Sequence, residues 1–467
     1  MPIRFVLPVL LFSSVASAAT PSYSLRYDAA TEAMSVRICV SESTDGLRFT
    51  ADSNAPRYIE GLARDAGGAL ERDNDGWTAH AWRAGECVTY RAVLARIGDS
   101  GKRGSASRHG KDLVSDPDLW LLRVANADEA EVHVEMPSGY AISAPWTPLP
   151  ATDKRQRFRI PPTPGDWMAR VAIGKFTESR VELPGGALHV ALLEGADSAE
   201  RTKLDEWLAH ISRAAVTAYG RLPLSDVQVL IIPVRGDSER EPVVFGQSTR
   251  GQGNALTLFV DVTQPAEEFD RDWVAVHELS HLFHPYVGSR GAWLAEGLAT
   301  YYQNVLRARA GLLTPQQAWQ QIDAGFSRGR ADIHTGNPIL EDAGDSRAFM
   351  RVYWSGTAYW LEVDTELRRG SANRLSIDEA LRRFDACCLP SYRRWEPAEF
   401  VAKLDALLGT DVFTRRFREY RARRDFPDTA ALYAEFGLRG AGDGLQFDDA
   451  APAADVRRAI MTSAIEK

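Results

Sequence analysis

The spacing of apolar residues changes abruptly at Gly185-Gly186, and this change constrains the fold more than any other feature of the chain. Between about Ser22 and Leu183, short stretches of alternating apolar and polar residues are separated by clusters of glycine, proline and aspartate. The clearest of these stretches are "MSVRICV", "CVTYRAVL" and "AEVHVEM", and helical periodicity is scarce. The pattern predicts a β-rich domain of the sandwich type.

Longer amphipathic and apolar stretches follow the two glycines. In "DSAERTKLDEWLAHISRAAVTAYG", Leu204, Leu208 and Ile211 fall on one face of a predicted helix. "VQVLIIPV" and "NALTLFVDV" (254–262) have the composition of strands, and the rest of the chain is predominantly helical in pattern. This half of the chain therefore mixes strands and helices.

At 467 residues, the chain is too long for one ordinary core. We predict an α+β protein with a β-sandwich-like N-terminal domain over residues 19–185 and an α+β domain ending in helices over residues 186–436. The glycine- and alanine-rich residues 437–467 are expected to form a tail or small appendage. The formal net charge of −8 argues against a nucleic-acid partner.

The first residues, "MPIRFVLPVLLFSSVASAAT", have the pattern of a cleavable secretory signal. Arg4 precedes an apolar run from Phe5 to Val15, and Ala16-Ser17-Ala18 is a small-residue cleavage site. The alternatives are a core strand or an uncleaved anchor, but a run of about eleven apolar residues is short for a membrane span. We expect a signal peptide over residues 1–18 and a periplasmic or secreted protein without stable membrane insertion.

The cysteine content also fits an oxidising compartment. The chain has four cysteines, and Cys39 and Cys87 both lie in strand-like runs, where a disulfide between them is plausible. Cys387 and Cys388 are adjacent and form either a vicinal disulfide or two buried thiols. No CxxC spacing is present, so a cysteine zinc site is not expected.

The sequence "VHELSHLF" places two histidines one helical turn apart. His277 and His281 would project from the same face of a helix, where their ring nitrogens can occupy two corners of a zinc tetrahedron. Glu278 projects about 100° round the helix, so it would border the metal as a base without being forced to bind it. The alternative is a pair of histidines on the flank of an ordinary helix.

Zinc needs a third protein ligand, and "WLAEGLATYY" supplies a candidate in Glu296. Pro285 and the glycines at 288 and 291 would end the first helix, and a second helix from about Ala292 would bring Glu296 back to the histidines. Two histidines and one glutamate leave the fourth position of a single zinc ion open for water, as catalysis requires.

HELSH followed by WLAEGLATYY resembles the gluzincin metallopeptidases, in particular the glycyl aminopeptidase and aminopeptidase N families. Relatives carry a later Y-x-x-G helix whose tyrosine stabilises the oxyanion, and "RVYWSGTAYW" matches it with Tyr353 and Gly356. The resemblance implies a thermolysin-like catalytic domain behind a β domain. Glycyl aminopeptidase relatives often append a PDZ domain, for which the segment after Gly437 is too short.

The chain departs from these families at two points. Only fourteen residues separate His281 from Glu296, a shorter connection than usual. Aminopeptidase N relatives bind the substrate amine with a glutamate in a G-x-M-E-N strand, whereas "RGQGNALTLF" at the presumed equivalent place has no acidic residue. Four further residues are weaker candidates. Arg250, Asn254 and His284 are candidates for contacts with substrate, and His284 is alternatively a candidate for a contact with a zinc-binding residue. Thr300 is a candidate for support of the Glu296 carboxylate.

The sequence thus predicts a zinc peptidase that cleaves peptides or proteins. Glu278 would activate water, Tyr353 would donate to the oxyanion, and the substrate would pair with the 254–262 strand. An aminopeptidase is the first expectation. The alternatives are an endopeptidase or partner-specific processing protease without amine anchoring, and a binding protein with a vestigial zinc site. No feature indicates the oligomeric state or the side-chain preference.

Overall fold

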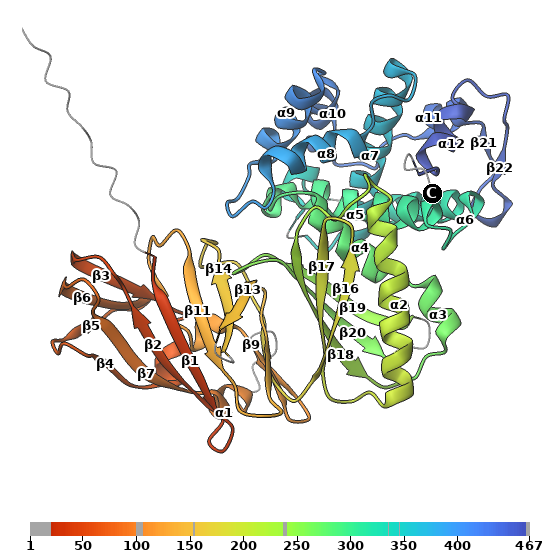
Figure 1. The fold of residues 1–467 in the computed structure, drawn as a ribbon. Helices are drawn as coiled ribbons and strands as arrows, with labels where there is room; N and C mark the ends of the chain where they lie inside the picture. Colours follow the sequence, from red (N-terminus) through yellow and green to blue (C-terminus); the bar gives the residue numbers. More distant parts are fainter. Residues whose placement is uncertain are drawn as a thin grey trace, which may run out of the picture.

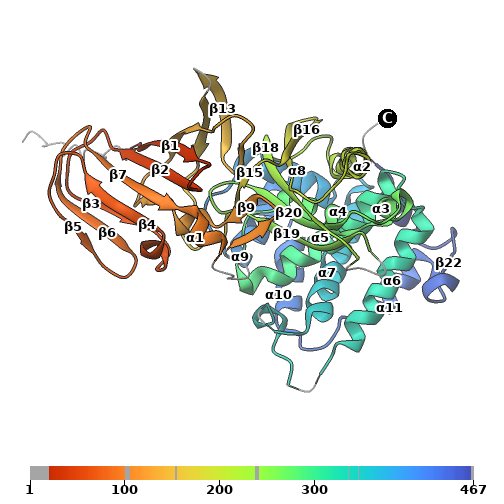
Figure 2. The ribbon, with the colours of Figure 1, turned by 90° about the horizontal axis from the view of Figure 1, so that it is seen from below.

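The computed structural model describes residues 20–99, 106–152, 155–236, 241–334, 336–344 and 346–463. The predicted signal peptide therefore lies outside the described residues. The strand-rich part comes first, the helices come last, and a five-stranded sheet lies between them (Figures 1 and 2). The predicted α+β fold class is confirmed. Among the described residues, no helix has both the length and the apolar character needed to span a membrane.

Strands β1 to β15 form three sheets, and in several of them the side chains alternate between the core and solvent. In β1, for example, Tyr23, Leu25 and Tyr27 are buried while their neighbours are exposed. The largest sheet has the order β13 (Thr147–Thr152), β14 (Arg155–Ile160), β11 (Ala130–Glu135), β1 (Ser22–Asp28), β2 (Ala33–Cys39), β7 (Cys87–Val93) and β4 (Ile59–Arg64). The predicted disulfide joins Cys39 and Cys87, which lie opposite each other in β2 and β7.

Two four-stranded sheets complete this part of the chain. The first consists of β10 (Arg123–Val124), β3 (Thr44–Thr50), β6 (Gly76–Trp82) and β5 (Leu70–Arg72). The second consists of β12 (Ala141–Ser143), β15 (Val171–Gly174), β9 (Asp112–Ser115) and β8 (Ala106–His109), with the short helix α1 (Leu94–Gly98) nearby. β9 and β15 pack against the five-stranded sheet that follows and so join the two halves of the molecule.

The five-stranded sheet has the order β16 (Thr177–Leu183), β17 (Gly186–Leu192), β18 (Asp226–Val234), β20 (Ala255–Asp261) and β19 (Val243–Thr249). β17, β18 and β20 are parallel, whereas β16 and β19 run antiparallel at the edges. β16 belongs to this sheet although it precedes the predicted boundary at residue 185. One face of the five-stranded sheet is covered by helices α2 (Ser198–Val216) and α4 (Val274–Ser280).

The position of β20 corrects one expectation. The 254–262 segment was predicted to offer its edge to substrate, but β20 is hydrogen-bonded on both sides, to β18 and to β19. Its residues are almost all buried, which is typical of an interior strand. The edge strand, which packs against α4, is β19 instead.

The remaining helices pack around α4 and α5. Their bounds are α3 (Ala266–Arg271), α5 (Ala292–Arg309), α6 (Pro315–Ala331), α7 (Phe349–Ser371), α8 (Ile377–Cys388), α9 (Pro397–Leu408), α10 (Val412–Arg421), α11 (Ala430–Phe436) and α12 (Ala454–Ile460). Cys387 and Cys388 at the end of α8 form a vicinal disulfide, one of the two predicted alternatives.

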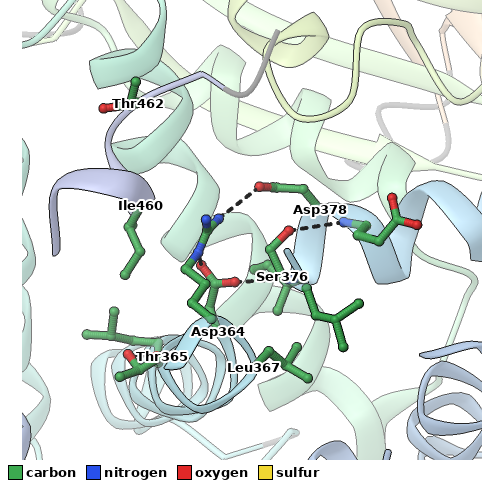
Figure 3. A network of polar contacts seen from close by, with 12 residues as sticks. Asp364, Thr365, Leu367, Ser376, Asp378, Ile460 and Thr462 are labelled. Atoms are coloured by element: carbon green, nitrogen blue, oxygen red, sulfur yellow. Dashed lines mark hydrogen bonds and ion pairs between the residues drawn. The ribbon is translucent and has the colours of Figure 1, made fainter. Parts of the chain in front are cut away.

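A buried polar network ties the C-terminal segment to these helices. Arg309 of α5 donates to both carboxylate oxygens of Asp378 and to the carbonyl oxygen of Ile460 in α12. Arg368 bridges Asp364 and Asp378, and Figure 3 shows both carboxylates with Ile460 beside them. Residues 438–463, with the small sheet of β21 (Leu438–Arg439) and β22 (Gln446–Phe447), therefore form a packed appendage.

Candidate metal centre

Helix α4 carries the first two candidate ligands on one buried face. His277 lies in α4, and His281 begins the single 3₁₀ turn η3 (His281–Phe283) that continues it. The two side chains are one turn apart, and their ring centroids are 5.0 Å from each other. Both residues are less than a tenth exposed, so the sequence positions two imidazoles side by side in a place with little solvent.

Helix α5 brings the third candidate ligand to the same point. The chain leaves η3 in extended backbone at His284, turns at Gly288 with a φ of 66°, and enters α5 at Ala292. The Oε2 atom of Glu296 lies 3.2 Å from Nε2 of His277 and 3.6 Å from Nε2 of His281. The ligand atoms of these three residues all lie within 4.8 Å of one another, and zinc accepts such a His–His–Glu donor set.

Each imidazole has its other nitrogen hydrogen-bonded. Nδ1 of His277 lies 2.9 Å from Oε1 of Gln303, an oxygen that can only accept, so His277 donates from Nδ1. Nδ1 of His281 lies 3.0 Å from Nε2 of His284, whose own Nδ1 donates to the carbonyl oxygen of Pro285. These bonds leave the Nε2 lone pairs of His277 and His281 directed toward Glu296, as metal-binding histidines require.

The glutamate between the histidines contacts the edge strand. The hydroxyl of Ser248 in β19 lies 2.9 Å from Oε2 of Glu278 and 2.8 Å from its backbone oxygen. Gly246 of the same strand makes this approach possible, because a Cβ at that position would lie 2.7 Å from Cγ of Glu278. The three candidate ligands line a cleft between β19, α4 and α5. The Glu278 carboxylate lines the same cleft without being one of the candidate ligands.

Tyr353 of α7 closes the other side of the cleft. Its ring is stacked on that of His277 at a centroid distance of 5.9 Å and an interplanar angle of 20°. Burial raises the pKa of its hydroxyl, and the charges of Glu296 and Glu278 raise it further. The hydroxyl therefore stays protonated and is a hydrogen-bond donor at neutral pH.

The charges of the centre reinforce one another. Burial alone would raise the pKa of Glu296, but the two imidazoles hold the pKa well below its ordinary value. Burial would lower the pKa of His277, but Glu296 outweighs this effect and raises it. Glu296 is consequently an anion facing two nitrogen ligands, which is the charge arrangement that a divalent cation needs.

Two of the weaker candidates, Arg250 and His284, contact the end of η3. Arg250 lines the cleft, but its buried guanidinium donates to the carbonyl oxygens of His281 and His284 and so fixes the end of η3. Burial lowers its pKa to about 10. His284 orients His281, the second of the two contacts considered for it.

The structure places the other two weaker candidates, Asn254 and Thr300, away from the predicted contacts. Asn254 is not among the residues lining the cleft; it precedes β20, where its carbonyl oxygen accepts from the backbone N–H of Gln228. The hydroxyl of Thr300 has no hydrogen-bond partner among the described residues, so it does not support Glu296. Both assignments rested on distance along the chain, which did not fix where these side chains point.

Two residues of the site were missed. Gln303 lies seven residues after Glu296, two turns along the same face of α5, so helical periodicity contained a signal for it. Ser248 had no such signal, because its contact with Glu278 depends on which strand lies at the edge of the sheet.

The chain matches the family model of the M61 glycyl aminopeptidases over residues 279–346. This stretch contains His281 and Glu296, but it begins after His277 and Glu278 and ends before Tyr353. No curated protein matches the chain. The family match thus runs from the end of α4 through α5 and α6 to residue 346.

Solved structures share the fold at low sequence identity. An aminopeptidase N family protein from Idiomarina loihiensis has a TM-score of 0.66 and 13% identity, covering 90% of this chain and 78% of its own. The M1 zinc metallopeptidase from Deinococcus radiodurans has a TM-score of 0.57 and 14% identity, with 88% and 95% covered. Yeast LTA4 hydrolase has a TM-score of 0.56 and 12% identity, with 90% and 70% covered. The predicted resemblance to the glycyl aminopeptidase and aminopeptidase N families is confirmed, and the enzyme class of zinc metallopeptidase agrees with it.

Proposed function

We propose that this protein is a zinc-dependent metallopeptidase that holds one zinc ion with His277, His281 and Glu296. The observation that carries the proposal is the donor set itself: three ligand atoms lie within 4.8 Å of one another, and both imidazoles are hydrogen-bonded at their other nitrogen. This set fits zinc and leaves a fourth position for solvent or substrate. When bound, zinc would lower the pKa of water and polarise the scissile carbonyl.

The side chains around this centre supply the remaining chemistry. Glu278 accepts the proton of the attacking water and passes it to the leaving amine, and Ser248 holds its carboxylate against β19. Tyr353 donates to the oxyanion that develops on the substrate carbonyl. The substrate backbone pairs with the edge of β19, which runs along the cleft.

A comparison of wild-type protein with Glu278→Gln tests the proposal. Both proteins should bind one zinc ion, and only the wild type should cleave a mixed peptide library. If folded wild-type protein binds no zinc, the proposed function is wrong. If Glu278→Gln cleaves as fast as wild type, the assigned base is wrong. If zinc binds but neither protein cleaves any peptide, the alternative of a binding protein with a vestigial site is favoured.

Aminopeptidase activity is the first form of this function, because the resembled families have it.

A second form of this function is favoured by the residues that line the cleft. Among the described residues that line it, the only carboxylates are Glu278 and Glu296, and β19 contains no acidic residue. Both carboxylates have roles at the zinc centre, so none of the described lining residues offers a third carboxylate for a substrate amine. This arrangement suits an endopeptidase or a partner-specific processing protease. Hydrolysis of matched peptides with free and acetylated N-termini separates the two forms.

We further propose that the protein acts outside the cytoplasm. The N-terminal signal pattern and the disulfides Cys39–Cys87 and Cys387–Cys388 support this location. Cell fractionation and N-terminal sequencing test it, with the mature chain expected to begin at Ala19.

A further inference from the structure

Exposed apolar side chains gather at one end of the metal cleft. Among the described residues, six large apolar side chains are exposed, and five of them lie at the start of edge strand β19 or beside the start of α7. We call these five the apolar rim: Val244 and Phe245 on β19, Ile333 after α6, and Phe349 and Met350 on α7. Single exposed apolar side chains are ordinary on a protein surface, whereas a group of them marks a binding surface.

The two parts of the apolar rim border one space. A cavity of about 550 Å³ adjoins the metal cleft, and Tyr353 lines both. Pro242, which immediately precedes β19, lines this cavity together with Met350 of α7. Ile333 belongs to the same region, because the carboxylate of the residue before it accepts a hydrogen bond from the first turn of α7. The rim therefore lies where the cavity and the metal cleft meet.

The apolar rim is also continuous with the proposed catalytic residues. Met350 and Phe349 precede Tyr353 by three and four residues, so they share its side of α7, about 4.5 and 6 Å along the helix axis. Phe245 lines the metal cleft and precedes Ser248, which contacts the proposed base, by about 10 Å along β19. A polypeptide that leaves the cleft toward the start of β19 thus reaches the rim within two or three residues of the scissile bond.

The direction of the substrate decides which of its residues reach the apolar rim. An added strand pairs more often in the antiparallel than in the parallel sense. An antiparallel substrate on the edge of β19 has its C-terminal side at the start of that strand. The rim therefore faces residues that follow the scissile bond.

The exposure of the apolar rim indicates what kind of chain binds there. Phe349 is 56% exposed and Phe245 is 50% exposed, so each offers a large apolar surface to a partner. A folded protein buries most of its large apolar side chains and protects its strand edges. Only an unfolded segment can pair with β19 and present apolar side chains at successive positions.

We propose that the apolar rim binds unfolded polypeptide segments that have apolar side chains at the second and third positions after the scissile bond. The inference rests on the proposed peptidase function for the position of that bond. The preference for an apolar segment is measurable by binding alone.

Binding to zinc-loaded Glu278→Gln protein tests the preference without turnover. The probes are two peptides with a fluorescent label at the C-terminus, Gly-Ser-Gly-Ala-Ala-Leu-Leu-Gly and the same peptide with Ser-Ser in place of Leu-Leu. Fluorescence anisotropy gives each Kd. The leucine peptide should bind at least about tenfold more tightly, because two apolar side chains leave water. Affinities equal within about twofold would overturn the proposal.

A double variant shows whether the apolar rim causes the preference. In the same protein, Phe349→Ser with Met350→Ser should reduce the ratio of the two affinities to about twofold or less, because the apolar contact is lost. Zinc content should stay unchanged, since both side chains are exposed in the first turn of α7. A double variant that keeps the full ratio would refute the assignment.

Met168→Ser is the matched control. Met168 is 40% exposed, close to the 36% of Met350, and it is not among the described residues that line the cleft or the cavity. Its carbonyl oxygen accepts from the backbone N–H of Gly251, beyond the far end of β19. The control should keep the ratio of the two affinities. If it lowers the ratio as much as the double variant does, the preference does not come from the apolar rim.

A second copy of this chain is the competing occupant of the apolar rim. In that case the double variant would change a dimer into a monomer in light scattering and leave the ratio of the two peptide affinities as it was. That result would overturn the proposal.

Cleavage by the wild type then locates the bound residues. In products of a mixed peptide library mapped by mass spectrometry, leucine, phenylalanine, methionine and valine should be enriched two and three residues after the scissile bond. Enrichment at the same distance before the bond would refute the antiparallel orientation. Absence of all cleavage would contradict the proposed function, while the binding series would still decide whether the apolar rim holds apolar segments.

Discussion

Replacement of Gln303 by leucine should weaken zinc binding without touching a ligand. In the structure, Nδ1 of His277 donates to Oε1 of Gln303 at 2.9 Å, and Gln303 is only 7% exposed. Leucine has a similar volume but cannot accept, and water has little access to replace the lost acceptor. The imidazole N–H would be buried and unpaired, which costs about 1–3 kcal/mol.

The expected loss of zinc affinity follows from that cost. Supporting hydrogen bonds to metal-binding histidines are worth about 10–100-fold in affinity, which corresponds to about 1.4–2.7 kcal/mol and agrees with the penalty for the unpaired N–H. Gln303→Glu should have the opposite effect, because a carboxylate is a stronger acceptor and makes the imidazole a better ligand. The zinc affinity of the wild type should therefore lie between the affinities of the two variants.

Competition with a chromophoric chelator at constant pH measures these affinities in folded protein. Gln316→Leu is the matched control. Gln316 lies on α6, away from the histidines, and donates to the carbonyl oxygen of Leu445. It should leave the Kd for zinc unchanged. If Gln303→Leu binds zinc as tightly as wild type, or if Gln303→Glu binds it less tightly, the orientation of His277 does not depend on this hydrogen bond and our account of the centre is wrong.

Three further predictions concern the side chains around the centre. Glu278→Gln should lower kcat by about 10²–10⁴ while zinc content by elemental analysis stays at the wild-type level, and a loss of zinc would mean that Glu278 is itself a ligand. Tyr353→Phe should lower kcat/KM by about 10²–10³, mainly through kcat; a change confined to KM would refute its donation to the oxyanion. Burial raises the pKa of Asp272 from its ordinary 3.8 to about 7. Between these two pH values the folded protein holds a proton that the unfolded chain releases, so the free energy of unfolding falls as the pH rises from the lower value to the higher one. Asp272→Asn removes the effect and should raise the free energy of unfolding in urea by up to about 4 kcal/mol at pH 8 and very little near pH 4; an equal effect at both values would contradict the raised pKa.

The zinc donor set could be predicted because each part of it is local in sequence. Two histidines four residues apart on one helix share a face whatever the surrounding fold is. The turn at Gly288 and the start of α5 at Ala292 also followed from local signals, so Glu296 could be expected to return to the histidines. Helix geometry and turn chemistry act over a few residues, and a single sequence contains that information.

The edge of the sheet was mispredicted because strand order is a non-local property. The apolar run of β20 was assigned to substrate binding, although a strand buried on both faces is more typical of the sheet interior. β19 has a mixed pattern, "VVFGQST", and its role depends on its antiparallel pairing with a strand that follows it in sequence. The contact between Ser248 and Glu278 exists only in that arrangement, so no short-range pattern could reveal it.

The position of Tyr353 has a physical basis in the glycine one turn after it. Helices α5 and α7 pack so closely at Gly297 and Gly356 that a Cβ on Gly356 would overlap the carbonyl oxygen of Trp293, and one on Gly297 would overlap the backbone of Gly356. Gly297 directly follows Glu296 in α5. The close contact of α5 and α7 at Gly297 and Gly356 therefore brings the Glu296 carboxylate and the Tyr353 phenol to the same cleft. The Y-x-x-G spacing is thus a packing requirement, and the glycine fixes the distance between a donor and a ligand that lie far apart in the sequence.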